Sequence, residues 1–349
     1  MQKKIIALAV AGLVSGAAFA QSNVNVYGIV DVGYARATAT NMTSTHNIAA
    51  GQLSSSRIGF KGTEDLGNGL KALFTLEYKL TNDDNSSIGA ARQQFVGLNG
   101  GFGTVVAGYL QTAGYDFGIA SGPLAGSVGL DALMKVGGSV LLTPNDSGRA
   151  SNAVAYISPS FGGVTLAYNH ARLDETSYDN TVAVPAGTAY KNNYANLLAA
   201  SFAQGPIAAN AVYAKISKPA STLSDDIVEY GVNGSYDFGV AKAFASWQSK
   251  DDKSLNDKNK KWGIGAAIPA GPAGTVAVQY AKSKIGETTA KDDVKSWTVA
   301  YTHGLSKRTT AYAGYNRVTN EAGGTTASLT APTVGGKSST LAFGVRHSF

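Results

Sequence analysis

The stretch Val24-Asn25-Val26-Tyr27-Gly28-Ile29-Val30-Asp31-Val32-Gly33-Tyr34 alternates between two kinds of residue. Its even positions are Val, Gly or Tyr, whereas Asn25 and Asp31 occupy odd positions. This period of two predicts a β-strand with one apolar face. Each such segment has about ten residues, the length of a tilted strand that crosses a membrane. The same alternation recurs in segments that begin at Leu70, Val228, Trp262, Val276, Trp297 and Leu341.

The composition excludes several classes of protein. The 349 residues include 42 Gly and 17 Tyr but no Cys, and only 15% are charged. Without Cys there is no disulfide scaffold, no Cys-ligated zinc or iron–sulfur site and no thiol nucleophile. The apolar fraction of 44% argues against a disordered chain. A mean hydropathy of -0.04 gives no sign of a bundle of membrane-spanning helices.

The first residues have the pattern of a secretory signal peptide. Lys3 and Lys4 precede an apolar run over residues 5–14, and Ala18-Phe19-Ala20 forms a small-residue cleavage site. We expect residues 1–20 to be removed and residues 21–349 to form a single domain; a buried N-terminal helix is the less favoured alternative. No second long apolar run follows, so a membrane can be crossed only by strands.

The connections between the predicted strands alternate in length. Seven are short turns, such as Gly67-Asn68-Gly69, and eight are longer polar loops. The first loop is expected over residues 37–54, and the third and longest over residues 112–148. Fifteen connections favour sixteen strands over eighteen. The pattern therefore predicts an all-β fold, a 16-stranded antiparallel transmembrane β-barrel with short periplasmic turns and long extracellular loops.

A soluble β-sandwich is the competing all-β fold. Its exposed strand faces would be charged, whereas here the polar faces are rich in Gly, Ser, Thr and Asn, as expected for a watered lumen. Aromatic residues near segment ends, such as Trp262 and Trp297, suit the girdles of a membrane barrel. The last strand ends on Phe349, which we expect to close the barrel and to act as its signal to the barrel-assembly machinery. A barrel of about 16 strands is wide enough for an aqueous channel.

Several motifs together resemble those of Gram-negative general porins of the neisserial and β-proteobacterial type. They are Val26-Tyr27-Gly28-Ile29-Val30-Asp31, Ser55-Ser56-Arg57-Ile58-Gly59-Phe60, Arg92-Gln93-Gln94-Phe95-Val96-Gly97-Leu98, Gly100-Gly101-Phe102-Gly103-Thr104-Val105 and the closing Gly344-Val345-Arg346-His347-Ser348-Phe349. The resemblance spans nearly all of the chain after residue 20, in the family's order. It implies a homotrimer in the cell outer membrane, in which the third long loop folds into the barrel and narrows it.

The chain also departs from the family pattern. Where the family usually carries Gly-Arg-Gln after the fifth strand, this chain reads Gly108-Tyr109-Leu110-Gln111. Loop three also lacks the usual Pro-Glu-Phe-Gly. The charges at the narrowest part of the channel therefore need to be located in this chain itself.

The charges expected at the pore constriction come from two sources. Alternation places Arg57 in the lumen, opposite in parity to Ile58. The resemblance implies that Arg92 and Arg149 join it. Such guanidinium groups stay ionised at physiological pH. Alternatively, the arginines are rim or subunit-contact charges. Loop three is long enough to reach inside and would contribute Lys135 and, to set up a field against the arginines, the carboxylates of Asp116 and Asp131.

These features favour passive diffusion of small hydrophilic solutes and ions through a water-filled channel, with a mild preference for anions. The alternatives are an adhesin or purely structural barrel, and a barrel enzyme. Catalysis would need a nucleophile served by a His, and only His170, with Asp174 and Glu175 nearby, is a candidate. We expect no enzyme activity, no cofactor and no metal site.

Paired carboxylates recur in the loops expected outside the cell. Their oxygens suit Ca²⁺ and Mg²⁺, which could bridge to lipopolysaccharide, although solvated loop charge is the simpler interpretation. Basic residues near position 255 interleave with Asp, which argues against a nucleic-acid partner. Expected partners are outer-membrane lipid and lipopolysaccharide, small hydrophilic solutes and anions, and further copies of the chain. The pairs are Asp83-Asp84, Asp225-Asp226, Asp251-Asp252 and Asp292-Asp293.

Overall fold

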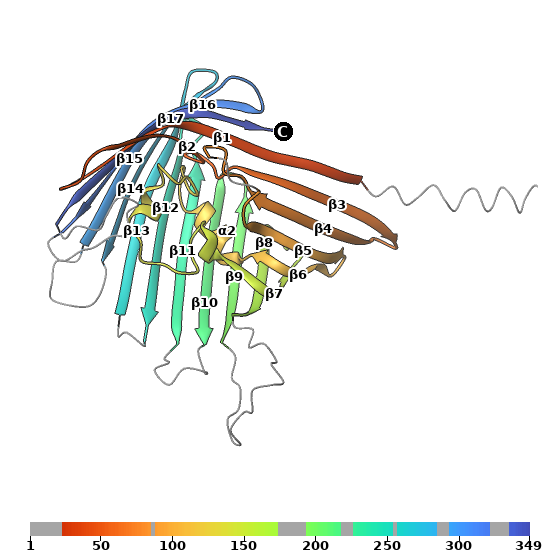
Figure 1. Cartoon of the computed structure of the whole chain (residues 1–349). Helices are drawn as coiled ribbons and strands as arrows, with labels where there is room; N and C mark the ends of the chain where they lie inside the picture. The colour runs from red at the N-terminus through yellow and green to blue at the C-terminus, as the bar shows by residue number, and fades with distance from the viewer. Residues whose placement is uncertain are drawn as a thin grey trace, which may run out of the picture.

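The computed structural model is one antiparallel sheet closed into a barrel (Figure 1). The structure describes residues 23–84, 88–173, 193–217, 226–253, 257–284, 293–321 and 335–349. Within a bilayer every backbone N–H and C=O must find its partner inside the protein, and a closed ring of strands meets this requirement. In these ranges no helix is both long and apolar enough to cross a membrane.

The strands follow one another around the ring in chain order, each antiparallel to its neighbours. Their bounds are β1 Asn23–Ala39, β2 Thr45–Ala50, β3 Arg57–Gly67, β4 Leu70–Lys79, β5 Ala91–Gly100, β6 Gly103–Gln111, β7 Arg149–Ile157, β8 Val164–Arg172, β9 Tyr194–Gln204, β10 Ile207–Ser217, β11 Ile227–Asp237, β12 Lys242–Asp252, β13 Asp257–Ala270, β14 Gly274–Lys284, β15 Asp293–Gly304, β16 Thr309–Asn320 and β17 Lys337–Ser348.

The segments β2 and β3 are two halves of one barrel strand. β1 pairs with β3 through residues 23–29 and with β2 through residues 32–37. Counted together, they make the barrel 16-stranded, which confirms the predicted fold class. β2 lies within residues 37–54, where a loop was expected; that prediction was wrong because β1 extends to Ala39 and offers β2 an edge to pair with.

Asp31 holds the bend that separates β2 from β3. Its carboxylate accepts hydrogen bonds from the backbone N–H groups of Leu53 (2.9 Å) and Ser54 (2.6 Å) and from the Tyr312 hydroxyl (2.6 Å). The residue is fully buried, and a buried carboxylate is tolerated only with such partners. Asp31 therefore ties the bend to β16 across the closing strands.

The barrel closes where β1 meets β17. Gly28 and Phe349 exchange two backbone hydrogen bonds, of 3.2 and 3.1 Å. The aromatic ring of Phe349 packs directly over Gly28, where an added Cβ would come within 2.4 Å of it. The chain's last residue thus lies at the seam of the barrel.

The seven short turns lie at one end of the barrel, between β3 and β4 and then between every second pair of strands to β15 and β16. The longer connections lie at the other end. Parts of several of them fall outside the described residues, as does the expected signal peptide over residues 1–20. The same holds for Asp174, Glu175, Asp225 and Asp292.

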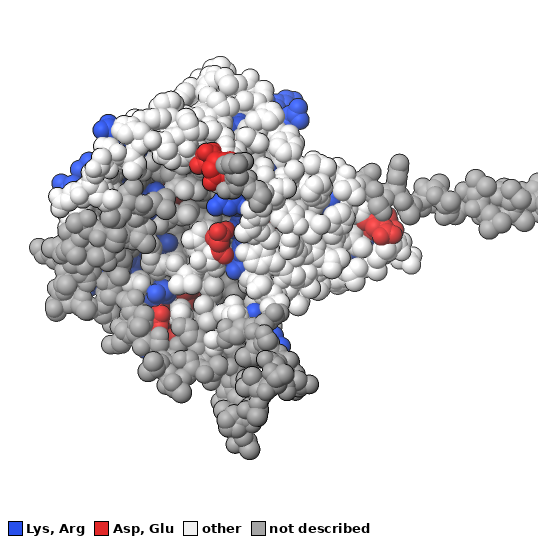
Figure 2. Space-filling model, viewed as in Figure 1, with Lys and Arg blue, Asp and Glu red and all other residues white. Residues whose placement is uncertain are grey.

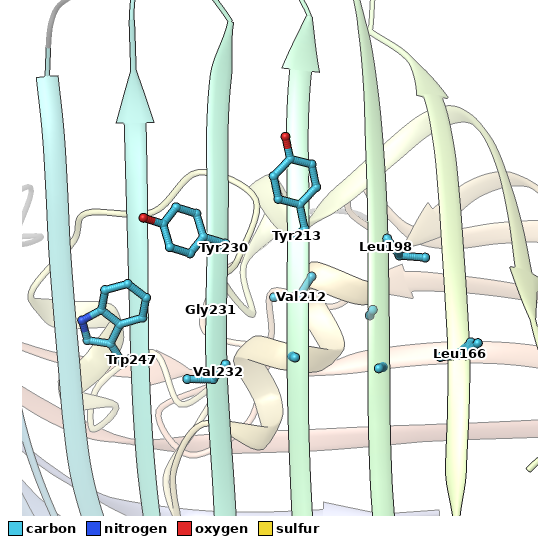
Figure 3. Close-up of a pocket in the computed structure, with 11 residues that line it drawn as sticks. Leu166, Leu198, Val212, Tyr213, Tyr230, Gly231, Val232 and Trp247 are labelled. Carbon is cyan, nitrogen blue, oxygen red and sulfur yellow. The ribbon is translucent and has the colours of Figure 1, made fainter. Parts of the chain in front are cut away.

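The outer face of the barrel is apolar and aromatic. Tyr213, Tyr230 and Trp247 lie on β10, β11 and β12 around a shallow hollow of about 400 Å³ that has no charged lining residue (Figure 3). Loop three passes behind the same strands. At Gly231 an added Cβ would come within 2.7 Å of the Phe117 ring of loop three, so this position faces inward. The hollow therefore faces lipid and is not a path for ions.

Loop three folds into the barrel, as expected. It carries α2 (Ala113–Ala120), α3 (Ala132–Lys135) and the short 3-10 helix η1 (Asp146–Gly148), and α2 lies inside the ring of strands (Figure 1). Apolar side chains fasten it to the inner wall, each stabilising the buried position by about 1.5–3 kcal/mol. Those in contact with buried wall residues include Phe117, Leu124, Leu130, Leu133, Val136, Leu141 and Leu142.

Polar wall residues hold the backbone of loop three. Glu229 of β11 accepts three hydrogen bonds in a row, from the N–H groups of Val140 (2.6 Å), Leu141 (3.0 Å) and Leu142 (3.0 Å). Other wall residues also bind the loop: Asn169 of β8 accepts from Ala113 N–H, Asn233 of β11 donates to Phe117 O, and Ser283 of β14 donates to Val136 O.

The three hydrogen bonds that Glu229 accepts from loop three lead to a prediction. Glu229→Ala leaves three backbone N–H groups without an acceptor, two of them buried. A buried N–H group without a partner costs about 1–3 kcal/mol of stability. We expect the returning half of loop three to detach from β11 and to expose Lys135. Trypsin should then cleave after Lys135 at least tenfold faster than in the wild-type barrel.

Glu64→Ala is the matched control, because Glu64 is exposed at the short-turn end of β3. It should leave the cleavage rate unchanged. Far-UV circular dichroism verifies that both variants keep their strands. An unchanged cleavage rate in Glu229→Ala would show that other contacts suffice to hold the loop.

Candidate functional site

Three arginines gather on the inner wall where β3, β5 and β7 begin, beside the root of loop three. Arg57 begins β3, Arg92 is the second residue of β5, and Arg149 begins β7. Glu77 of β4 lies among them, with its Oε1 2.7 Å from Arg92 Nε and 3.9 Å from Arg57 Nη1. Figure 2 looks obliquely into the barrel mouth and shows blue and red side chains within the hollow. We call these four residues the arginine cluster.

A β-bulge aims Arg92 into this cluster. The register between β4 and β5 shifts so that Glu77 faces Gln93 while Tyr78 faces Ala91, which leaves Arg92 as the extra residue. A bulge redirects a side chain against the alternation of its strand. The side chains of Arg92 and Glu77 are consequently buried against each other, with 4% and 5% of their surface exposed.

Tyr115 of α2 joins the arginine cluster to loop three. Its hydroxyl accepts a hydrogen bond from Arg92 Nη2 at 3.4 Å. The guanidinium carbon of Arg149 lies 4.4 Å from the centre of the Tyr115 ring, the geometry of a cation–π contact. Because Tyr115 is itself buried, these contacts fix the two guanidinium groups relative to the loop.

The cluster carries more positive than negative charge. Arg149 Nη1 donates to Asp146 Oδ1 at 2.9 Å, but the Asp146 side chain is 78% exposed to water. The buried Nε and Nη2 of Arg149 have no hydrogen-bond partner among the described residues. Arg57 has the loosest contact with Glu77 and the more open side chain, 22% exposed. The arrangement can therefore attract an anion, and Arg57 is the member of the cluster most accessible to it.

Asp116 lies away from the arginines. It is exposed on α2 and accepts a hydrogen bond from Gln111 Nε2 at 2.6 Å. It borders a hollow of about 210 Å³ between α2 and the wall of β4–β8, whose lining includes Gln93 and Asn169 but no Lys or Arg. No ion pair among the described residues joins Asp116 to an arginine.

Asp131 belongs to the anchorage of loop three, and Lys135 ends the short helix α3 that Asp131 caps. Asp131 Oδ1 accepts from Leu133 N–H at 3.0 Å and caps α3, while Oδ2 accepts from Gly126 N–H at 3.0 Å. Burial raises the pKa of Asp131, against the lowering effect of these backbone bonds and of Lys261. Burial likewise lowers the pKa of Lys135, which the charge of Asp131 opposes.

This placement corrects the expectation that Asp131 faces the arginines across the channel. Only 1% of its surface is exposed, and its bonds go to loop three and to Gln279 of the wall. A carboxylate enclosed in this way presents little charge to a solute. A short helix needs a cap for its free N–H groups, and Asp131 fills that need.

Four residues of the site and its surroundings were not singled out from the sequence. Glu77 lies on the polar face of its predicted strand, so a lumen position was foreseeable, but its partner Arg92 depends on the bulge. Tyr115 and Glu229 gave no signal, because their roles depend on where loop three meets the wall. Lys261, buried on β13, likewise places its charge near Asp131 and Glu229.

His170, the one candidate for catalysis, lies on β8 near the long-loop end. Its Nδ1 is 2.9 Å from Asn196 Oδ1, and its ring centre is 6.1 Å from that of Tyr194. Its predicted neighbours Asp174 and Glu175 lie outside the described residues. Within the described ranges no hydroxyl nucleophile contacts the ring.

Comparison with known proteins gives independent evidence of the family to which the chain belongs. The profile of a family described as Gram-negative porin matches residues 7–323. The chain is 33% identical to outer membrane porin protein 32 of Delftia acidovorans, with 100% of both chains covered. It is 31% identical over 199 residues to major outer membrane protein P.IB of Neisseria meningitidis serogroup B, covering 55% of this chain and 56% of that protein.

A solved structure supports the same assignment. An anion-selective porin from Comamonas acidovorans superposes with a TM-score of 0.77 at 26% sequence identity, covering 94% of this chain and 100% of that chain. The barrel, its inward loop and the full-length sequence match agree: the chain belongs to the Gram-negative porin family and is an outer-membrane porin.

Proposed function

We propose that this porin lets small hydrophilic solutes diffuse passively through a water-filled lumen, with a mild preference for anions set by the arginine cluster. The observation that carries this proposal is the excess of guanidinium groups: Arg57 and Arg92 share one buried carboxylate, Glu77, and Arg149 pairs only with the exposed Asp146. A similar porin from Comamonas acidovorans is described as anion-selective, which supports the same direction.

The proposed selectivity is electrostatic and needs no catalytic group. A unit charge about 4 Å away changes an ion's energy by about 1 kcal/mol in water, and by more where the wall and loop exclude water. A surplus of positive charge beside the narrowed lumen lowers the free energy of an anion there relative to that of a cation of the same size. Salt screens this effect over about 10 Å at 0.1 M.

The site residues take different parts in this proposal. Arg57 presents its charge to solutes, because it is the more exposed of the pair facing Glu77. Arg92 and Arg149 are held by Glu77, Tyr115 and Asp146 and set the shape of the positive wall. Asp116 and Lys135 contribute to the electrostatic potential of the lumen beside loop three, whereas Asp131 holds the loop in place.

The remaining parts of the proposal concern assembly. We infer that residues 1–20 are a cleaved signal peptide, that the barrel assembles through its closing strand ending at Phe349, and that three copies associate as a homotrimer in outer-membrane lipid and lipopolysaccharide. The rival functions are an adhesin or structural barrel and, through His170, an enzyme. Single-channel conductance distinguishes a porin from an adhesin or structural barrel, because a structural barrel forms no large open channels.

Single-channel recording tests the proposed function directly. Purified, refolded protein added to a planar bilayer should give stepwise current increases. The channel should close in three equal substeps at high voltage if the unit is a trimer. Absence of conductance from protein that shows a folded β-barrel spectrum would refute the channel function.

Charge variants test the selectivity. Arg57→Gln should lower the anion-to-cation permeability ratio by about twofold to fivefold, because it removes one accessible charge while Arg92 still pairs with Glu77. Glu77→Gln should shift the ratio in the opposite direction, because it removes the one buried carboxylate of the cluster. Reversal potentials across a tenfold salt gradient measure both.

Lys242→Gln is the matched control for charge, because Lys242 begins β12 at the short-turn end, far from the cluster along the barrel axis. Its reversal potential should equal that of the wild type. If Arg57→Gln and Lys242→Gln gave the same reversal potential, the arginine cluster would not govern selectivity. A clear cation preference in the wild type would contradict the proposal as a whole.

A further inference from the structure

Five cations gather on the outer face of the barrel, near the long-loop ends of β13–β16. Cross-strand register brings them together: Lys260 lies opposite Lys284, and Lys282 lies opposite Lys295. Arg317 is the fifth; it lies opposite Trp297, one outward position along β15 from Lys295. These residues share the parity of the exposed Trp262 and Trp297, so they point away from the lumen. We call them the outer basic cluster.

Without an anionic partner, electrostatic repulsion within the outer basic cluster destabilises the barrel. Like charges directly opposite each other on neighbouring strands are destabilising, and the cluster holds two such pairs. Two carboxylates of the described residues relieve part of the repulsion: Asp293 pairs with Lys282, and Glu321 pairs with Lys295. Lys260 and Lys284 are exposed. Counting these seven groups, the patch keeps a net positive charge.

The cluster lies at a defined level of the membrane. Directly towards the barrel's middle are two aromatic pairs, Trp262 with Tyr280 and Trp297 with Tyr315, whose ring centres are 5.5 and 5.4 Å apart. Beyond them the outer face is apolar, as at Ile264. Trp and Tyr mark the boundary between hydrocarbon and headgroups, so the cations lie at the headgroup level on the long-loop side.

The opposite sector of the barrel provides a contrast. At the same end of β4, β5 and β6, the outward positions are Tyr78, Gln94 and Tyr109, and Gln94 donates a hydrogen bond to the Tyr78 hydroxyl at 3.0 Å. These side chains are uncharged. Single cations lie outward at the long-loop ends of other strands, such as Lys215 of β10, which pairs with Asp226. The outer basic cluster therefore differs from these sectors in gathering five cations on four adjacent strands.

We propose that the outer basic cluster binds the phosphate groups of the outer-leaflet lipid, which in a Gram-negative outer membrane are those of lipopolysaccharide. Lys supplies mobile ammonium groups to phosphate oxygens, and Arg317 supplies a planar fork. The acyl chains of the same lipid lie against the aromatic and apolar surface below. This inference deepens the lipid partnership proposed above and rests on the outer-membrane location, not on the channel.

Native mass spectrometry of the intact, detergent-purified porin tests this proposal with diphosphorylated lipid A as the probe. The variant Lys282→Gln/Lys295→Gln/Arg317→Gln should bind lipid A about a hundredfold more weakly, because each cation near a lipid surface contributes roughly a factor of five. Asp293→Asn/Glu321→Gln should bind it more tightly, because the competing carboxylates are gone. Dephosphorylated lipid A should not distinguish any of these proteins.

Two controls keep the outcome interpretable. Lys242→Gln/Lys307→Gln/Arg308→Gln removes the same charge at the short-turn end and should bind lipid A as the wild type does. Lys282→Arg/Lys295→Arg/Arg317→Lys keeps the charge and should retain binding even if the glutamine variant folds poorly. Equal affinity of the glutamine variant and the wild type would overturn the proposal. So would equal binding of dephosphorylated lipid A, or full displacement by millimolar inorganic phosphate, which would indicate a free-anion site.

Discussion

The constraint on which this structure depends is that a bilayer offers no hydrogen-bond partner to the backbone. The chain meets it by closing a ring, with Gly28 and Phe349 bonded at the seam. Once the ring is closed, each strand side chain points either outward to lipid or inward to the lumen, and only the thickness of the sheet separates the two environments. At β11 the change occurs within two residues: Tyr230 lies in the outer aromatic surface, while Gly231 meets Phe117 of loop three on the inside.

The second consequence concerns the space that such a ring encloses. Loop three occupies part of it without a strand ladder of its own, so the wall must satisfy the loop's backbone. This explains why the inner face carries buried Asn, Gln, Ser and one Glu at the points of contact, as Asn233, Ser283 and Glu229 illustrate. In the sequence these polar residues suggest a surface in contact with water. In the structure, some of them bind the backbone of loop three.

The same physics decides what the sequence could predict. Alternation placed the strands, and it placed Arg57 in the lumen correctly, because Arg57 starts a regular strand. Arg92 has the parity of the lipid-facing Val96, so alternation alone would put it outside; only the family resemblance pointed inward, and the bulge opposite Glu77 is the physical reason. Asp131 was misjudged because a cap on a short loop helix has no sequence period.

The arginine cluster and the outer basic cluster are built from different cations, and the difference fits the roles proposed for them. Inside, Arg92 and Arg149 are planar groups clamped by Glu77 and Tyr115, so their charge keeps its position beside the lumen. Outside, four of the five cations are Lys, a residue whose long stem can lie along apolar surface while its ammonium group reaches a polar layer. A fixed charge suits selection among passing ions. A mobile charge suits lipid phosphates that do not hold one position.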